Sequence, residues 1–234
     1  MIKEAIVLAG GFGTRLQSVV KELPKSMAPI NHKPFLEYLL DFLIAKGIEN
    51  IIFSVGYKSS DIKNHFKGQY QNLKISYAEE KEALGTGGAI AYAMSFAKSE
   101  QVLVLNGDTL FLADPQEQLK FHLQLKADVS LALKPMENFD RYGRVELDND
   151  QRIVKFIEKK YCDKGLINGG SYIFNKSIFS KFDLPNRFSI EQDFFEKYFG
   201  DLHLFGFISS AYFLDIGIPS DYDKAQDEFK SITY

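Results

Sequence analysis

A glycine-rich segment near the N-terminus carries the residues best suited to bind phosphate. Residues 8–16 read Leu-Ala-Gly-Gly-Phe-Gly-Thr-Arg-Leu and follow directly on an apolar strand-like run at 3–7. Glycine accepts positive φ and leaves no Cβ between backbone and ligand, so successive N–H groups can turn toward one anion. Arg15 and Lys25 supply two cations beside this loop. The pattern predicts a site for the phosphates of a nucleoside triphosphate.

Two better-known glycine motifs do not fit this loop. A dinucleotide-binding fingerprint needs a third glycine where Leu16 stands and an acidic residue at the end of the second strand, and the strand at 51–56 has none. A Walker loop needs Gly-Lys followed by Ser or Thr, and that triplet does not occur in the chain. The remaining alternative is a glycine-rich turn between a strand and a helix, with its arginine facing water.

Two aspartates stand where α/β sheets place ligand sites. Asp108 follows the strand expected at 102–105, and Asp215 follows the apolar pair 213–214. Ligands bind outside the carboxyl ends of such strands. Two carboxylates, completed by substrate phosphates and waters, suit Mg²⁺, which rarely takes a full cage of protein ligands. Each aspartate taken alone is also a typical turn residue or helix cap.

Seven ordered blocks of residues, spread over nearly the whole chain, resemble the signature of the sugar-1-phosphate nucleotidyltransferases. Within that family, segments 18–29 and 34–40 are most similar to guanylyltransferases acting on D-glycero-α-D-manno-heptose 1-phosphate. The blocks are Gly10–Leu16 with Pro24-Lys25, Leu84–Ala89, Asn106-Gly107-Asp108, Tyr142-Gly143, Glu158-Lys159, Asn168-Gly169-Gly170 and Asp215-Ile216-Gly217.

The resemblance implies a fold and a reaction. The fold is α/β, a Rossmann-like mixed and mainly parallel sheet flanked by helices. The reaction is a Mg²⁺-dependent transfer of a nucleoside monophosphate from GTP to a sugar 1-phosphate, giving GDP-heptose for a surface polysaccharide such as a capsule or lipopolysaccharide. The alternatives are mannose 1-phosphate with GTP, glucose 1-phosphate with UTP or dTTP, and a non-catalytic nucleotide-sugar sensor. A sensor would be expected to lose Arg15, Lys25 or an aspartate, and all are present.

The site residues can be assigned to roles on the same basis. A phosphate monoester, with a second pKa near ~6, is mostly dianionic at neutral pH, so alignment and charge rather than a general base are expected to drive the reaction. Arg15 and Lys25 are the expected catalytic residues, and Asp108 and Asp215 the expected metal ligands. The resemblance implies nucleotide binding by Leu8, Ala9, Gly10, Gly11, Gly13, Thr14, Glu80, Gly85, Thr86 and Gly107. It implies sugar-phosphate binding by Tyr142, Gly143, Glu158, Lys159, Asn168 and Gly169.

Glu80 is the residue expected to select the base. It lies five residues before Gly85, the place from which this family's base-reading side chain reaches the nucleobase. A carboxylate only accepts hydrogen bonds, and guanine presents two adjacent donors, N1–H and the exocyclic amine. The alternative is that Glu79, Glu80 and Glu82 form a solvated acidic loop beside Lys81.

The elements that must position these residues alternate along the first half of the chain. This alternation of strands and helices predicts βαβ units and a mainly parallel sheet. Strands are expected at 3–7, 50–55, 73–78, 101–105 and 128–133. Helices are expected over Leu36–Leu43 with a stop at Gly47, and over 60–67, 88–97 and 115–125, the last capped by Asp114.

The second half of the chain changes style. A hairpin is expected at 144–147 and 152–157, with strands at 171–174, 203–208 and 212–214. A helix is expected over 190–199, with a capping box made by Ser189 and Gln192, and a last helix over 222–230.

Composition limits the class of protein. The chain has 234 residues, 45% of them hydrophobic, which predicts one nucleotidyltransferase domain over 1–234, with a nucleotide half at about 1–135 and a sugar half at about 136–234. A net charge of −3 argues against a nucleic-acid partner, which would need a basic face. No apolar run of membrane-spanning length and no signal-peptide pattern occur, so we expect no membrane association and a cytoplasmic protein. A homo-oligomer is compatible with the sequence.

Overall fold

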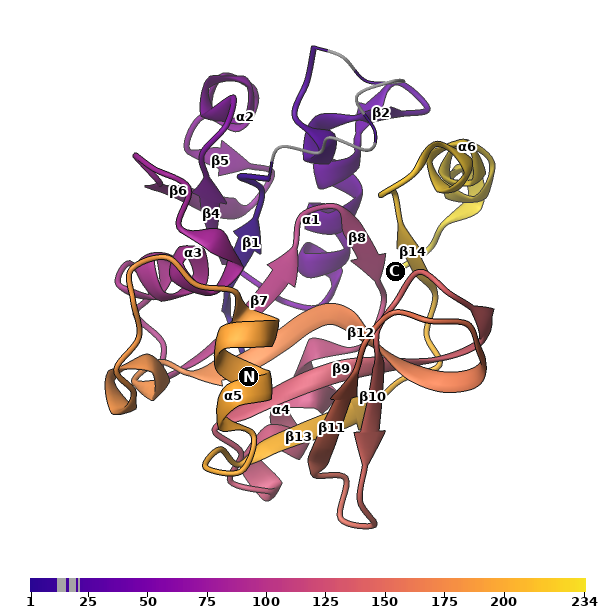
Figure 1. The fold of residues 1–234 in the computed structure, drawn as a ribbon. Coiled ribbons are helices and arrows are strands. Elements are labelled where there is room, and N and C mark those ends of the chain that lie inside the picture. The colour runs from indigo at the N-terminus through magenta and orange to yellow at the C-terminus, as the bar shows by residue number, and fades with distance from the viewer. Residues whose placement is uncertain (12–15, 17–19, 21) are drawn as a thin grey trace.

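Parallel strands from the first half of the chain form the centre of a ten-stranded sheet (Figure 1). The structure is a computed structural model, and it describes residues 1–11, 16, 20 and 22–234. Strand β1 (Glu4–Leu8) lies between β4 (Asn50–Val55) and β7 (Gln101–Asn106), and β4 continues to β6 (Leu73–Glu79), all in parallel. These strands are largely apolar because helices cover both faces of the sheet.

The second half of the chain extends the same sheet with antiparallel strands. The 14-residue strand β12 (Cys162–Asn175) lies between β7 and β9 (Val129–Phe139), and β13 (Leu204–Ile208) pairs parallel to β9. The hairpin of β10 (Arg144–Leu147) and β11 (Ile153–Ile157) pairs with the first part of β12. One sheet therefore carries the segments of both halves.

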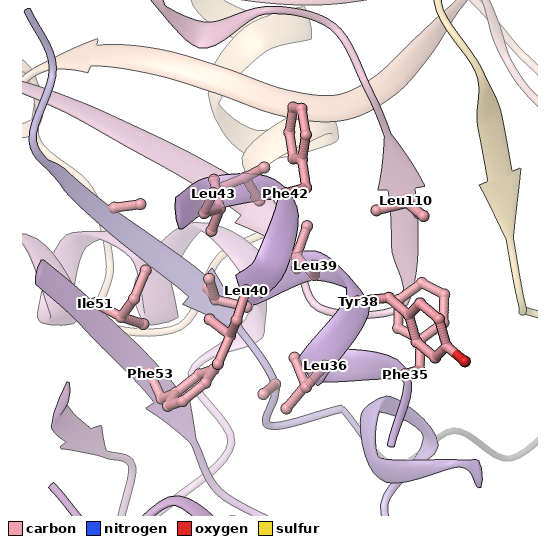
Figure 2. Close-up of a cluster of buried hydrophobic side chains, with 14 of the residues drawn as sticks. Phe35, Leu36, Tyr38, Leu39, Leu40, Phe42, Leu43, Ile51, Phe53 and Leu110 are labelled. Carbon is pink, nitrogen blue, oxygen red and sulfur yellow. The ribbon is translucent and has the colours of Figure 1, made fainter. Parts of the chain in front are cut away.

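Side chains alternate between the two faces of the central strands. In β4, Ile51 and Phe53 join one buried cluster, whereas Ile52 joins the other. The first cluster packs under α1 (Phe35–Ala45), α2 (Ser59–Phe66) and α6 (Pro219–Glu228). The second packs under α3 (Gly85–Met94) and the π-helix η4 (Ile190–Phe195), which α5 (Glu196–Tyr198) continues. Figure 2 shows part of the first cluster, in which the seven buried side chains of α1 lie near Ile51 and Phe53 of β4 and near Leu110.

The mixed sheet flanked by helices confirms the expected fold class. The stop of α1 at Gly47 is also confirmed, and Gly47 has a φ of +78°. Helix α4 (Pro115–Gln124) begins as expected, with the Asp114 side chain accepting from the N–H groups of Gln116 and Glu117.

Several expected boundaries were wrong. The helix expected over 88–97 occupies 85–94, and the strand expected at 171–174 is the last third of β12. At the start of η4 the Ser189 hydroxyl accepts from the Gln192 N–H, as expected. The Ser189 N–H, however, donates to the carboxylate of Asp193 at 2.7 Å rather than to the side chain of Gln192. Short elements that sequence reasoning did not anticipate are β2 (Pro29–Ile30), β3 (Lys33–Pro34), β5 (Gln69–Tyr70), β8 (Thr109–Phe111) and the 3-10 helix η2 (Lys25–Met27).

Within the described ranges, every helix is too short or too polar to span a bilayer.

Candidate functional site

A small ribbon brings together two aspartates that are distant in the sequence. Strand β8 pairs antiparallel with β14 (Phe213–Asp215), and this places Asp215 opposite Thr109. The N–H of Ile216 donates to the carbonyl oxygen of Asp108 at 3.1 Å. Figure 1 shows the two strands side by side, with α6 following β14. Asp108 and Asp215 consequently lie next to one another, just beyond the carboxyl end of β7.

One lysine bridges these two carboxylates. The Nζ atom of Lys25 lies 2.6 Å from Oδ2 of Asp108 and 3.3 Å from Oδ1 of Asp215. The Lys25 side chain is 11% exposed, and those of Asp108 and Asp215 are 37% and 19% exposed. Two carboxylates against one ammonium leave a net charge of about −1 when all three are ionised. The three residues form a charged centre at which a further cation would be attracted.

The environment of Asp215 sets its protonation. Burial raises the pKa of the Asp215 carboxyl, and the neighbouring Asp108 charge raises it further, whereas Lys25 and the N–H of Gly217 act in the opposite direction. A Cβ on Gly217 would lie 2.8 Å from Oδ1 of Asp215 and 3.2 Å from Nζ of Lys25. Glycine at position 217 therefore leaves room for this ion pair.

A cavity of about 290 Å³ brings two of the expected nucleotide-binding residues, Gly10 and Glu80, onto one surface. The Glu80 carboxylate is held in place, because Ser54 Oγ donates to Oε1 at 3.1 Å and the Leu84 N–H donates to Oε2 at 3.2 Å. Each oxygen keeps a further lone pair for a ligand. A carboxylate fixed by two donors is suited to read a pair of donors on a base.

Leu8, Ala9 and Gly107, also expected to bind the nucleotide, do not line this cavity but join the ends of the central strands next to Gly10. The Ala9 N–H donates to the Ser54 carbonyl at 2.8 Å, and the Gly107 N–H donates to the Leu8 carbonyl at 2.9 Å. A Cβ on Gly107 would lie 2.6 Å from that Leu8 oxygen, so only glycine permits the approach of the two strand ends. No atom of the described residues lies within 4 Å of where a Cβ on Gly11 would be. Gly13, Thr14 and Arg15 lie outside the described residues.

Gly85 and Thr86 follow the cavity-lining residues 80–83 in the chain and contact the segment at Phe188 and Ile190. Gly85 has a φ of +72°, and a Cβ there would lie 2.6 Å from the Phe188 carbonyl oxygen. The Thr86 hydroxyl accepts from the Ile190 N–H at 3.0 Å, and the Gly87 N–H donates to the Phe188 carbonyl at 2.9 Å. The glycine-rich start of α3 is thus joined to the segment that leads into η4.

All six residues expected to bind the sugar phosphate line one cavity of about 270 Å³. The cavity lies between the β10–β11 hairpin, the middle of β12 and η4, and Asp215 of the charged centre also lines it. The six residues are Tyr142, Gly143, Glu158, Lys159, Asn168 and Gly169. Burial raises the pKa of the Tyr142 hydroxyl, and the nearby Asp215 charge adds to this effect, so Tyr142 stays neutral.

Sequence reasoning missed a third wall of the same cavity. Glu191, Gln192 and Glu196 line it from η4 and α5. Asn168 Nδ2 donates to Oε1 of Glu191 and to the Tyr172 hydroxyl, both at 2.9 Å. Burial raises the pKa of Glu196, and the charges of Glu158 and Glu191 raise it further. The capping pattern indicated a helix here, but no sequence signal indicated which of its faces meets β12.

The donor set around Asp108 and Asp215 fits a hard divalent cation. Among residues 1–11, 16, 20 and 22–234, no group of three or more His, Cys, Asp or Glu side chains is arranged to hold a metal alone. Mg²⁺ typically takes one or two carboxylates and completes its shell with substrate oxygens and waters. Two adjacent carboxylates beside a cavity meet that requirement.

Comparisons with known proteins show the family of this chain. The family model described as nucleotidyl transferase matches residues 4–231. D-glycero-alpha-D-manno-heptose 1-phosphate guanylyltransferase from Aneurinibacillus thermoaerophilus is 52% identical over 97% of this chain and 98% of its own length. The enzyme of the same name from Campylobacter jejuni is 46% identical over 94% of this chain and 96% of its own length.

A solved structure is also similar throughout. The crystal structure of HddC from Yersinia pseudotuberculosis superimposes with a TM-score of 0.89 at 36% identity, covering 97% of this chain and 100% of that one. A second structure of HddC, complexed with GMP-PN, gives a TM-score of 0.87 at 35% identity, with the same coverage.

Proposed function

We propose that this chain, which belongs to the nucleotidyl transferase family, transfers GMP from GTP to D-glycero-α-D-manno-heptose 1-phosphate. The products are GDP-heptose and pyrophosphate. The observation that carries the substrate pair is the 52% identity, over 97% of the chain, to an enzyme named for that reaction. The complex of HddC with GMP-PN supports a guanine nucleotide. The held carboxylate of Glu80 supports it independently, since it can accept from guanine N1–H and the exocyclic amine.

In the proposed reaction, a phosphate oxygen of the sugar 1-phosphate attacks the α-phosphorus of GTP. A new P–O bond forms there as the bond to the β-phosphate oxygen breaks, and pyrophosphate leaves with that electron pair. No proton need be removed from the nucleophile, because its phosphate is already mostly dianionic at neutral pH. The protein's contribution is to align the two phosphates and to neutralise charge.

Lys25 has the position to act on the reacting phosphates. Its ammonium contacts Asp108 and also Asp215, which lines the sugar cavity. We propose that it contacts the α-phosphate and the attacking oxygen once substrates displace it from the aspartates. The role of Arg15 in stabilising the leaving pyrophosphate rests on the sequence.

Asp108 and Asp215 would hold a Mg²⁺ ion in this reaction. Such an ion, when bound, offsets the negative charge that gathers on the phosphates in the transition state. In the structure both carboxylates contact Lys25, and they would be free to hold the metal once the lysine has moved to the phosphates.

A pyrophosphate-release screen tests the substrate pair. GTP, ATP, UTP, dTTP and CTP would each be combined with heptose, mannose and glucose 1-phosphates in the presence of MgCl₂. We expect GTP with the heptose 1-phosphate to give the highest kcat/KM. Pocket discrimination per methylene-sized group is limited to about 1–3 kcal/mol, so mannose 1-phosphate should retain some activity. A higher kcat/KM for mannose or glucose 1-phosphate would refute the heptose assignment while leaving the reaction class intact.

A further inference from the structure

The loop that carries Tyr142 and Gly143 is held by side chains. Residues 140–143 connect β9 to β10, and their backbone makes no hydrogen bond to other backbone groups in the described part of the chain. The Arg141 guanidinium forms an ion pair with Asp221, in the first turn of α6. The two side chains are 30% and 20% exposed. This pair ties the loop to the helix that follows Asp215 and Gly217.

Arg141 also fixes the ring of Tyr142. The guanidinium carbon lies 5.4 Å from the ring centroid, a cation–π distance. The same ring meets Phe213 edge-on, with centroids 5.8 Å apart and planes at 78°. Phe213 in turn meets Phe111 edge-on, at 5.6 Å and 82°. Tyr142 is therefore held between a cation and a row of aromatic rings that begins in β8.

Arg141 lies behind the wall of the sugar cavity. Tyr142, Phe213 and Asp215 line that cavity and also line a second one, of about 230 Å³, in which Arg141 and Asp221 lie. Arg141 and Asp221 do not line the sugar cavity. The pair can therefore act on a bound sugar phosphate through Tyr142, which lines both cavities.

We infer that Arg141 and Asp221 are positioning residues, whose ion pair sets Tyr142 and Gly143 in the conformation that binds the sugar 1-phosphate. The inference rests on the proposed function, since it assigns the pair to the sugar substrate of that reaction. Small displacements of groups that orient a substrate have large kinetic effects, so a loop without backbone anchors needs such a tie. The nucleotide cavity, built on Gly10 and Glu80, does not depend on this loop.

The test compares the KM for the sugar 1-phosphate with the KM for GTP in each variant. Arg141→Gln and Asp221→Asn remove one charge each; asparagine keeps the shape of aspartate, whereas glutamine is a shorter polar replacement for arginine. We expect the KM for the sugar 1-phosphate to rise roughly tenfold in each variant, and the KM for GTP to stay within about twofold of the wild type. Arg141→Lys, which retains the charge, should recover part of the loss. A purely structural defect would alter both KM values and the melting temperature together.

A double variant tests whether the two residues act as a pair. If Arg141 works through Asp221, combining Arg141→Gln with Asp221→Asn should raise the KM for the sugar no further than one substitution does. A KM for the sugar in the double variant that rises by the product of the two single-variant increases would overturn the inference. So would an unchanged KM for the sugar in both single variants, or an equal rise in the KM for GTP.

The Lys33–Asp41 ion pair provides a matched control. Its side chains are also 30% and 20% exposed, and Lys33 also lies over an aromatic ring, 4.5 Å from the centroid of Tyr38. The pair joins β3 to α1, away from both cavities. Asp41→Asn should leave both KM values unchanged. A wild-type protein that releases no pyrophosphate with any sugar 1-phosphate would refute the proposed function and this inference together, whereas an active wild type with unaltered variants would refute only the positioning role.

Discussion

The Glu80 carboxylate shows how much a single residue's role depends on its surroundings. In the sequence it is one of three acidic residues in four positions, which composition alone assigns to a solvated loop. In the structure, Ser54 of β4 donates to one of its oxygens and the N–H of Leu84, just before α3, donates to the other. This restraint lowers the entropy cost of pairing with a base, which a mobile surface glutamate would pay on binding.

Glu80→Gln should relax the choice of base. Glutamine replaces one acceptor oxygen with a donor, so one guanine N–H would face an N–H group and lose its partner. An unpaired group costs roughly 1–3 kcal/mol, and kcat/KM for GTP should fall correspondingly relative to UTP and ATP. The same ratio measured for Glu82→Gln, on the same loop, is the control. Unchanged GTP selectivity in Glu80→Gln would mean that another group reads the base.

Asp108→Asn and Asp215→Asn should each abolish most metal-dependent turnover. Each substitution removes one of the two charged oxygens beside Lys25, and a bound metal provides several kcal/mol of transition-state stabilisation, so kcat should fall on the order of 10²-fold or more. Asp227→Asn, at an exposed pair with Lys230, is a matched change elsewhere. Activity of either active-site variant in excess EDTA would show that these residues do not serve a metal.

At the scale of elements, periodic segments were predictable and pairing partners were not. Helix α4 followed from Asp114-Pro115, because a cap and a first-turn proline are local signals. β8 and β14 have three residues each and no hairpin turn between them, so no local pattern indicates that they pair. That pairing is what joins Asp108 to Asp215. The sequence therefore indicated both aspartates as strand-end residues, while their contact with Lys25 required the tertiary structure.

The glycine run at the start of α3 misled the helix prediction for a related reason. Glycines lower helix propensity, and the predicted helix begins only at Gly88, the last glycine of the run. In the structure they allow close contact with the 186–190 segment, and Gly87 and Gly88 have no room for a Cβ. The start of α3 therefore depends on a segment about a hundred residues later in the chain.

Gly85→Ala should destabilise the fold measurably. Alanine would have to adopt a φ of +72° with its Cβ 2.6 Å from the backbone oxygen of Phe188. We expect the free energy of unfolding to fall by about 1–3 kcal/mol, from the midpoint and slope of urea denaturation. Gly68→Ala is the control, since a Cβ there meets nothing within 4 Å, and its stability should stay within about 0.5 kcal/mol of the wild type. Equal stabilities of the two variants would contradict the packing role.

At the scale of the whole molecule, one buried histidine ties stability to pH. His122 in α4 is fully buried, and burial lowers its pKa, although Asn175 and the charge of Asp128 partly oppose this. Its ring nitrogens contact Ser130 Oγ at 3.1 Å and Asn175 Oδ1 at 3.2 Å. The neutral ring satisfies both, with one nitrogen donating and one accepting.

The free energy of unfolding should therefore fall as the pH drops below about 6.5. Below that pH, His122 takes up a proton in the unfolded chain but not in the folded one, so the unfolded state binds more protons. One proton contributes at most about 1.4 kcal/mol per pH unit, and the contribution is absent well above pH 7. Urea denaturation of wild type and His122→Gln between pH 5 and 8 measures it. The variant should show the shallower dependence, whatever its absolute stability, and parallel curves would exclude His122 as the cause.

The position of β12 between β7 and β9 has a consequence for synthesis. A nascent chain leaves the ribosome N-terminus first, and domains begin to form in that order. When β1, β4, β6 and β7 have emerged, the apolar strand β7 is still an unpaired sheet edge, and it remains so until β12 is made. Unpaired apolar edges template association with other chains. A chain released before residue 162 should therefore precipitate rather than persist as a soluble half, which makes premature termination a loss of the whole protein.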